Sequence, residues 1–190
     1  MKPGKRINCR SKTPYRWARK ALLFLLRVTV HNEDQLSAKL EKGRAVVCSN
    51  HVSYLDGIII SLASPRPMIF PVDTDFSVNS FWSRLILRIF ENFGFGEVVP
   101  MDSNNPMSLR QLKKRIEMGD SLLIFPEGRI SSTGELQPEQ PGLSWLIKHC
   151  KPEVIHMRLE GIENSALFSK SGKHPHPRTI IRFCTESYRA

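Results

Sequence analysis

Short apolar runs alternate along the chain with longer stretches in which apolar residues recur every three or four positions. The short runs predict buried strands, and the periodic stretches predict helices that turn one face toward a core. Strands are expected at residues 45–49, 68–72, 97–100, 121–125, 153–159 and 179–183. Helices are expected at residues 14–30, 57–63, 79–93, 106–118 and 141–150. This alternation predicts an α/β fold with a mostly parallel central sheet flanked by helices.

The first predicted helix, residues 14–30, is amphipathic and basic. Its apolar positions include Trp17, Phe24 and Leu25, and arginines and lysines flank them. A basic amphipathic helix with a tryptophan is typical of helices that lie in a membrane interface. A helix packed on the protein body with its charges in solvent is a second, compatible interpretation. The uninterrupted apolar run at 21–26 is too short to span a bilayer, which takes about 20 apolar residues.

The distribution of charged residues along the chain is more informative than the net charge. The 190 residues carry 28 Lys and Arg against 18 Asp and Glu, a net charge of +10. Residues 1–30 contain nine basic residues and no acidic one, so residues 31–190 carry 19 minus 18, or +1. We therefore divide the chain into a basic arm, 1–30, and a body, 31–190. Such an arm suits anionic lipid or nucleic acid, and a solvated tail is the third interpretation.

The segment 49–57 follows a predicted strand and opens a predicted helix. In open α/β sheets, ligands bind beyond the carboxyl ends of the strands. His51 in this segment can transfer protons near neutral pH. Asp56, slightly more than one helical turn further on, can hold the other imidazole nitrogen and fix the ring. Alone, the pair also fits a structural contact, with Asn50 and Ser53 capping the helix or holding the loop.

A second segment, 124–136, also follows a predicted buried strand, and it contains the turn Pro126-Glu127-Gly128-Arg129. Backbone N–H groups and a guanidinium at the end of a strand suit an anionic group such as a phosphate. The alternative is an ordinary turn that ends the strand and carries a surface Glu–Arg pair.

Together the two segments resemble the signature blocks of the glycerolipid acyltransferase family, which includes the 1-acylglycerol-3-phosphate acyltransferases. Residues 50–56 match the family's NHxxxxD signature, and residues 125–128 match its FPEG block. The chain is especially similar to the acyltransferase portion of bacterial 2-acylglycerophosphoethanolamine acyltransferases, which are often fused to an acyl-carrier-protein synthetase. This similarity extends from about Leu22 to Lys173. The resemblance implies a glycerol-3-phosphate acyltransferase-like fold, with residues 31–190 as the acyltransferase domain.

The resemblance also implies an activity: transfer of a fatty acyl group from a thioester donor to the free hydroxyl of a lysophospholipid. The donor would be acyl-CoA or an acyl carrier protein, and neither a cofactor nor a metal is implied. His51 would be the general base, and Asp56 would stabilise the imidazolium. The implied substrate-binding residues are Glu127, Gly128, Arg129, Asn50 and Ser53.

The basic amphipathic helix makes membrane lipids with an anionic surface an expected partner of the protein. Trp17, Phe24 and Leu25 would contact this surface, with the protein peripheral or monotopic at the cytoplasmic face of the inner membrane.

Three positions depart from the family pattern. Arg129 follows Gly128 directly, where many members have an intervening Thr, and His156, which we interpret as a strand residue, replaces a frequent Pro. Asp102 stands where the second block commonly has an Arg. Asp102 would repel a dianionic phosphate monoester and could pair with an ammonium, so we expect lysophosphatidylethanolamine as the acceptor. The alternatives are lysophosphatidate as acceptor, giving phosphatidate, and Asp102 as a turn cap only.

Two functions of other classes remain as alternatives. A nucleic-acid-binding module would use the basic arm, but the near-neutral body argues against it. A hydrolase would use the His–Asp pair on water, but the sequence has no evident nucleophile elbow. The segment with His174 and His176 is flanked by prolines and lacks nearby Cys or carboxylates, which favours a surface loop over a metal site.

Overall fold

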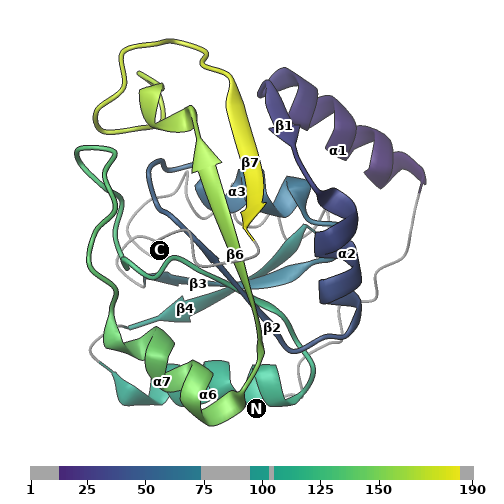
Figure 1. The fold of residues 1–190 in the computed structure, drawn as a ribbon, viewed down its shortest axis with the longest axis vertical. Helices are drawn as coiled ribbons and strands as arrows, with labels where there is room; N and C mark the ends of the chain where they lie inside the picture. The colour runs from purple at the N-terminus through teal and green to yellow at the C-terminus, as the bar shows by residue number, and fades with distance from the viewer. Residues whose placement is uncertain (1–12, 74–94, 103–104, 185–190) are drawn as a thin grey trace.

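The computed structural model describes residues 13–73, 95–102 and 105–184 (Figure 1). Within them a seven-stranded sheet has the order β1-β7-β6-β2-β5-β3-β4. Its strands are β1 (Val28–Val30), β2 (Ala45–Ser49), β3 (Met68–Asp73), β4 (Gly96–Met101), β5 (Leu122–Ile124), β6 (Glu153–Glu160) and β7 (Thr179–Cys184). The helices are α1 (Thr13–Leu25), α2 (Glu33–Glu41), α3 (Asp56–Ala63), α6 (Pro106–Glu117), α7 (Pro141–Cys150) and the 3₁₀ helix η1 (Ile162–Asn164).

The strand pairing confirms the predicted α/β fold with a mostly parallel sheet. Among the described strands only β6 and β7 pair antiparallel. The other neighbouring pairs of described strands are parallel. The predicted helix at 79–93 lies outside the described residues.

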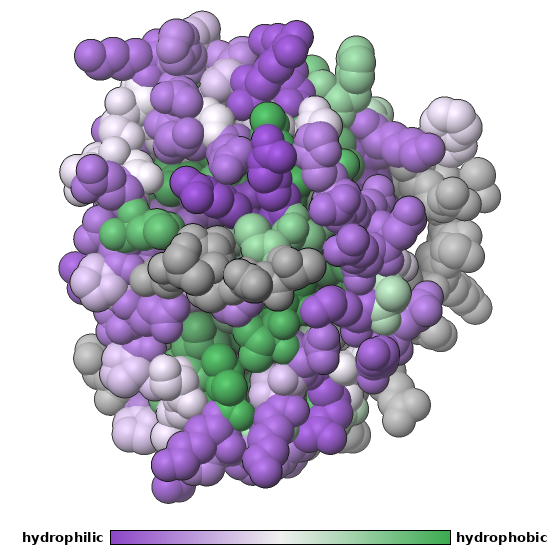
Figure 2. All heavy atoms as spheres, in the orientation of Figure 1, coloured by the Kyte–Doolittle hydropathy of each residue, from purple (hydrophilic) through white to green (hydrophobic). Residues whose placement is uncertain are grey.

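Helices cover both faces of the sheet, so its central strands are apolar on both sides. All five residues of β2 are buried. On one face α6 and α7 bury Leu112, Ile116 and Leu146, and on the other α2 and α3 bury Leu36 and Ile59 among others. Figure 2 shows hydrophobic side chains in the middle of the viewed face, above α6 and α7, within a surface that is otherwise mostly polar.

The first helix ends at Leu25, so the prediction of a helix over residues 14–30 is wrong in its last part. Arg27 has a left-handed backbone, with φ of 52°. Val28–Val30 then forms β1, which pairs with β7. The β-branched Val-Thr-Val run suits a strand, and the free edge of β7 supplies its hydrogen-bonding partner. The sheet therefore begins inside the range assigned to the basic arm.

The helix α2 is an element that the sequence pattern did not predict. It is mostly charged or polar and buries only Leu36 and Leu40, which are four residues apart. Two apolar anchors make a weak periodic signal. Leu36 and Leu40 nevertheless join the main core, so α2 is packed as part of the body.

One edge of the sheet collects the ends of five strands, and we call it the carboxyl edge. The parallel strands β2, β3, β4, β5 and β6 end there. Because β7 runs opposite to β6 and β1 is parallel to β7, these two strands begin at the same edge. Residues that follow β2 and residues that precede β1 therefore lie along one side of the molecule.

Candidate active site

The predicted His–Asp pair is present at the carboxyl edge, directly after β2. His51 follows β2 by two residues, and Asp56 is the first residue of α3. The Nδ1 atom of His51 lies 2.9 Å from Oδ2 of Asp56. A carboxylate accepts a hydrogen bond, so Nδ1 carries the proton and the neutral imidazole keeps a lone pair on Nε2. The His51 side chain is 19% exposed, which leaves it accessible to a substrate.

Asp56 is fixed far more firmly than an ordinary surface carboxylate. Its side chain is 0% exposed. Besides His51, Oδ2 accepts from the backbone N–H groups of Val52 at 2.6 Å and Ser53 at 2.8 Å. The Ser53 hydroxyl donates to Oδ1. These donors satisfy both oxygens of the buried carboxylate and fix its orientation toward His51.

The second segment packs directly against His51. The ring of Phe125, the residue after β5, stacks on the imidazole with centroids 4.1 Å apart and planes 14° from parallel. The backbone N–H of Ser131 donates to the His51 carbonyl at 2.8 Å. His51 is therefore held by its backbone, its ring face and its Nδ1 atom. Sequence spacing could not reveal these contacts, because they depend on β2 and β5 being neighbours in the sheet.

The side chains of Asn50 and Ser53 form hydrogen bonds within the protein. The Asn50 amide donates to the Leu159 carbonyl at 2.9 Å and accepts from the Leu159 N–H at 2.8 Å, which ties the loop to the end of β6. The Ser53 hydroxyl contacts Asp56 and also accepts from the Leu55 N–H. Both side chains are buried, so the structure gives them a positioning role. Their contact with substrate stays a prediction.

The residues predicted to hold the acceptor follow β5, next to the dyad. Glu127 is buried, with 1% of its surface exposed. Gly128 has φ of +70°, and a Cβ there would lie 3.0 Å from the Gln140 side chain, so glycine suits this turn. Arg129 is exposed beside them. Their place at the carboxyl edge is compatible with acceptor binding, which stays a prediction.

The structure also places the remaining positions that depart from the family pattern or were weighed as alternatives. Asp102 is exposed just after β4, and its backbone forms a turn with Asn105. His156 lies within β6, as predicted, and burial lowers its pKa. His174 and His176 are exposed outside the strands and helices.

The helix α1 turns its apolar residues in two directions. Leu23, and Leu26 just after the helix, pack against the core, whereas Trp17 is 71% and Phe24 is 86% exposed. Arg19 is also turned inward: it donates to the carbonyls of Leu62 and Ala63 at the end of α3. Arg19 thus fastens α1 to the body instead of contributing to a free basic surface. None of the described helices is long and apolar enough to cross a membrane.

A buried Asp that orients a reachable His beyond a central strand of an α/β sheet is an arrangement suited to general-base chemistry. The model of the family described as Acyltransferase matches residues 27–159. The chain therefore belongs to the Acyltransferase family, and the predicted class of O-acyltransferase is the class of this family.

A solved structure has a similar fold. It is the 1-acyl-sn-glycerophosphate (LPA) acyltransferase PlsC from Thermotoga maritima, with a TM-score of 0.61 and 15% sequence identity. The match covers 90% of this chain and 66% of that chain, so this chain spans just under two thirds of that protein's length. At this identity the likeness concerns the fold, and it confirms the predicted glycerolipid acyltransferase architecture.

Proposed function

We propose that the protein transfers a fatty acyl group from a thioester donor, acyl-CoA or an acyl carrier protein, to the free hydroxyl of a lysophospholipid. The observation that carries this proposal is the dyad. Its orientation leaves Nε2 of His51 as the proton acceptor, and Asp56 is buried and fixed by hydrogen bonds. Membership of the Acyltransferase family supplies the reaction class.

The reaction needs one base and no covalent enzyme intermediate. The acceptor hydroxyl oxygen attacks the thioester carbonyl carbon while its proton moves to Nε2 of His51. The carbon–sulfur bond then breaks, and the leaving thiolate takes the proton back from the imidazolium. The products are an ester and a free thiol, and His51 ends neutral. Asp56 stabilises the transient imidazolium, and general-base catalysis of this kind contributes typically about 10²–10⁴-fold.

We propose lysophosphatidylethanolamine as the preferred acceptor, with lysophosphatidate as the alternative. The turn from Glu127 to Arg129 would hold the phosphate-glycerol part, since it adjoins His51 through Phe125. Asp102 supports the ethanolamine lipid because it is exposed at the same carboxyl edge, where an anion opposes a dianionic head group.

We place the reaction at a membrane surface, at the cytoplasmic face of the inner membrane. The support is an exposed apolar surface at the carboxyl edge. Tyr54, within the dyad segment, is 50% exposed, and its backbone N–H donates to the carbonyl of Phe168. The neighbouring Leu167 is 69% exposed. Apolar side chains beside a site for lipid acceptors suit contact with a bilayer.

Product analysis tests the proposal. The protein is incubated with a mixture of lysophospholipids and, separately, with acyl-CoA or acylated carrier protein, and the lipids are identified by mass spectrometry. We expect a lysolipid to gain one acyl chain and an equal amount of thiol to be released, with neither in H51A. Thiol release that is independent of the acceptor would indicate a hydrolase. An absence of product with both donors would contradict the proposal.

A further inference from the structure

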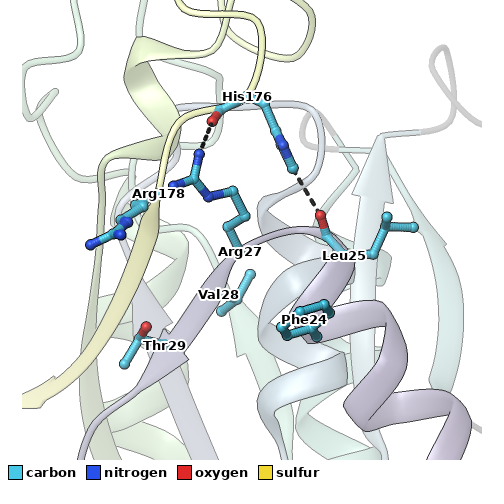
Figure 3. A pocket seen from close by; sticks show the side chains of 7 residues that line it. All are labelled: Phe24, Leu25, Arg27, Val28, Thr29, His176 and Arg178. Carbon is cyan, nitrogen blue, oxygen red and sulfur yellow. Dashed lines mark hydrogen bonds between the residues drawn. The ribbon is translucent and has the colours of Figure 1, made fainter.

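A pocket of about 530 Å³ lies where the end of α1 meets the segment that leads into β7. Figure 3 shows Arg27 between the apolar side chains of Phe24 and Leu25 on one side and Arg178 on the other. Val28, Thr29 and His176 complete its lining. Most of these residues are exposed, so this is an open surface pocket, separate from the dyad.

Hydrogen bonds fix the two walls of the pocket relative to each other. The Nε2–H of His176 donates to the carbonyl of Leu25 at 2.8 Å, and the Arg27 guanidinium donates to the carbonyl of His176 at 3.2 Å. The Thr179 N–H donates to the carbonyl of Arg27 at 3.1 Å. The pocket is therefore formed before any ligand enters it.

The lining of the pocket carries positive charge only. Arg27 and Arg178 line it, and no lining residue is acidic. The two segments that build it, 13–32 and 164–184, contain no Asp or Glu at all. In the described part of the chain, neither guanidinium forms an ion pair with a carboxylate. Two guanidinium groups without an acidic partner are suited to a phosphate, which they can bind through several N–H donors.

The apolar side chains at the rim of the pocket indicate which kind of phosphate-containing ligand fits it. Phe24 is 86% exposed and Leu25 is 65% exposed. Neither a soluble phosphate nor a nucleic-acid backbone gives such side chains an apolar environment. A phospholipid at a bilayer surface does, because its phosphate lies directly above glycerol and acyl chains.

We propose that this pocket binds the phosphate of an anionic phospholipid in the membrane surface, with Arg27 and Arg178 as its cations and Phe24 and Leu25 inserted beside it. This docking site goes beyond the proposed acyl transfer and does not depend on it, since the bound lipid is neither acceptor nor product.

The sheet connects the docking site to the dyad. Val30 pairs with Ile181, and Ile181 pairs with Leu159, whose backbone holds Asn50. The two sites therefore lie along the same carboxyl edge, about three strand spacings apart, or roughly 14 Å. A lipid held at Arg27 and Arg178 would bring the edge that carries His51 against the bilayer, where a lysolipid acceptor resides.

Vesicle co-sedimentation tests the proposal without any acyl donor. Binding is compared on phosphatidylcholine vesicles and on phosphatidylcholine mixed with phosphatidylglycerol. We expect the wild type to prefer the anionic vesicles. The R27Q/R178Q double variant should weaken anionic binding roughly tenfold to thirtyfold, since each basic residue near such a surface contributes about fivefold. R178Q alone should weaken it by about fivefold.

The matched control is K42Q/K151Q, which removes the same charge from exposed positions that precede β2 and β6, at the opposite edge of the sheet. It should change binding less than about twofold. Circular dichroism checks the fold of each variant, and turnover on a detergent-dispersed lysolipid should be unchanged in R27Q/R178Q. Equal weakening in both double variants would overturn the site. Tight binding of soluble glycerol phosphate, or of duplex DNA, that is lost in R27Q/R178Q would overturn the lipid as its ligand.

Discussion

The two sites at the carboxyl edge are built in opposite ways. At the dyad, polar groups are buried and hydrogen-bonded: Asp56 and Asn50 make their contacts inside the protein. At the end of α1, apolar side chains are exposed, and Arg27 and Arg178 have no carboxylate partner in the described residues. Burial at the first site fixes one geometry of the His–Asp pair. At the second site, the exposed apolar side chains and the two arginines are left available to contact a binding partner.

The dyad gives the largest expected effect. We expect H51A to lower kcat/KM by about 10²–10⁴-fold, because the base is lost while the buried carboxylate keeps its backbone donors. Thiol release measured with saturating acceptor reports the rate, and thermal unfolding reports the fold. Near-normal turnover in a folded H51A protein would exclude His51 as the base.

The charge of Asp56 can be separated from its geometry. In D56N the amide oxygen can still accept from His51, Val52 and Ser53, and the amide N–H₂ can donate to the Ser53 hydroxyl. We therefore expect a folded variant that is less stable by about 1–2 kcal/mol and slower by roughly 10²-fold, because the imidazolium loses its anion. Steady-state kinetics and a thermal melt measure the two effects. An unchanged kcat in D56N would show that orientation alone is sufficient.

Phe125 tests whether stacking positions the imidazole. F125L should lower kcat by about tenfold with little change in KM, because a loosened ring spends less time in the productive orientation. F183L is the control, since Phe183 packs on the core without touching His51. Equal losses of activity in the two variants would assign Phe125 to packing alone.

The exposed end of α1 is expected to affect binding and not the chemical step. F24S should weaken vesicle binding by about fivefold, since a partly inserted aromatic ring contributes on the order of 1 kcal/mol. M118S removes another exposed apolar side chain, 50% exposed and near the opposite edge, and should have little effect. Removing residues 1–30 would be a poorer test, because β1 and the Arg19 contacts with α3 would go with them. Equal vesicle binding by F24S and wild type would contradict membrane contact at Phe24.

How far the sequence predicts each region depends on the range of its contacts. His51 and Asp56 are only five residues apart in sequence, so the motif alone could place them together. Phe125 and Ser131 reach His51 only because β5 lies beside β2, and strand order is not encoded in local spacing. The short strand β1 depends in the same way on the edge that β7 offers. At the docking site, Arg27 and Arg178 are 151 residues apart in sequence, so no local pattern could pair them.

The smallest expected effect concerns the choice of acceptor. Asp102 is exposed just after β4, and β4 lies three strands from β2 on the side away from β7. Its charge therefore acts on the head group across solvent, where an exposed pair contributes at most about 1 kcal/mol. In a competition between equal amounts of lysophosphatidylethanolamine and lysophosphatidate, we expect the wild type to favour the ethanolamine lipid. D102R should reduce that preference by about threefold to fivefold, less so at high salt, because screening weakens exposed charges. D102N serves as the control that removes the charge while keeping the shape of the side chain. Its acceptor preference should lie between those of the wild type and D102R. A strong wild-type preference for lysophosphatidate would instead make the protein a phosphatidate-forming enzyme and would exclude Asp102 as the determinant of acceptor choice.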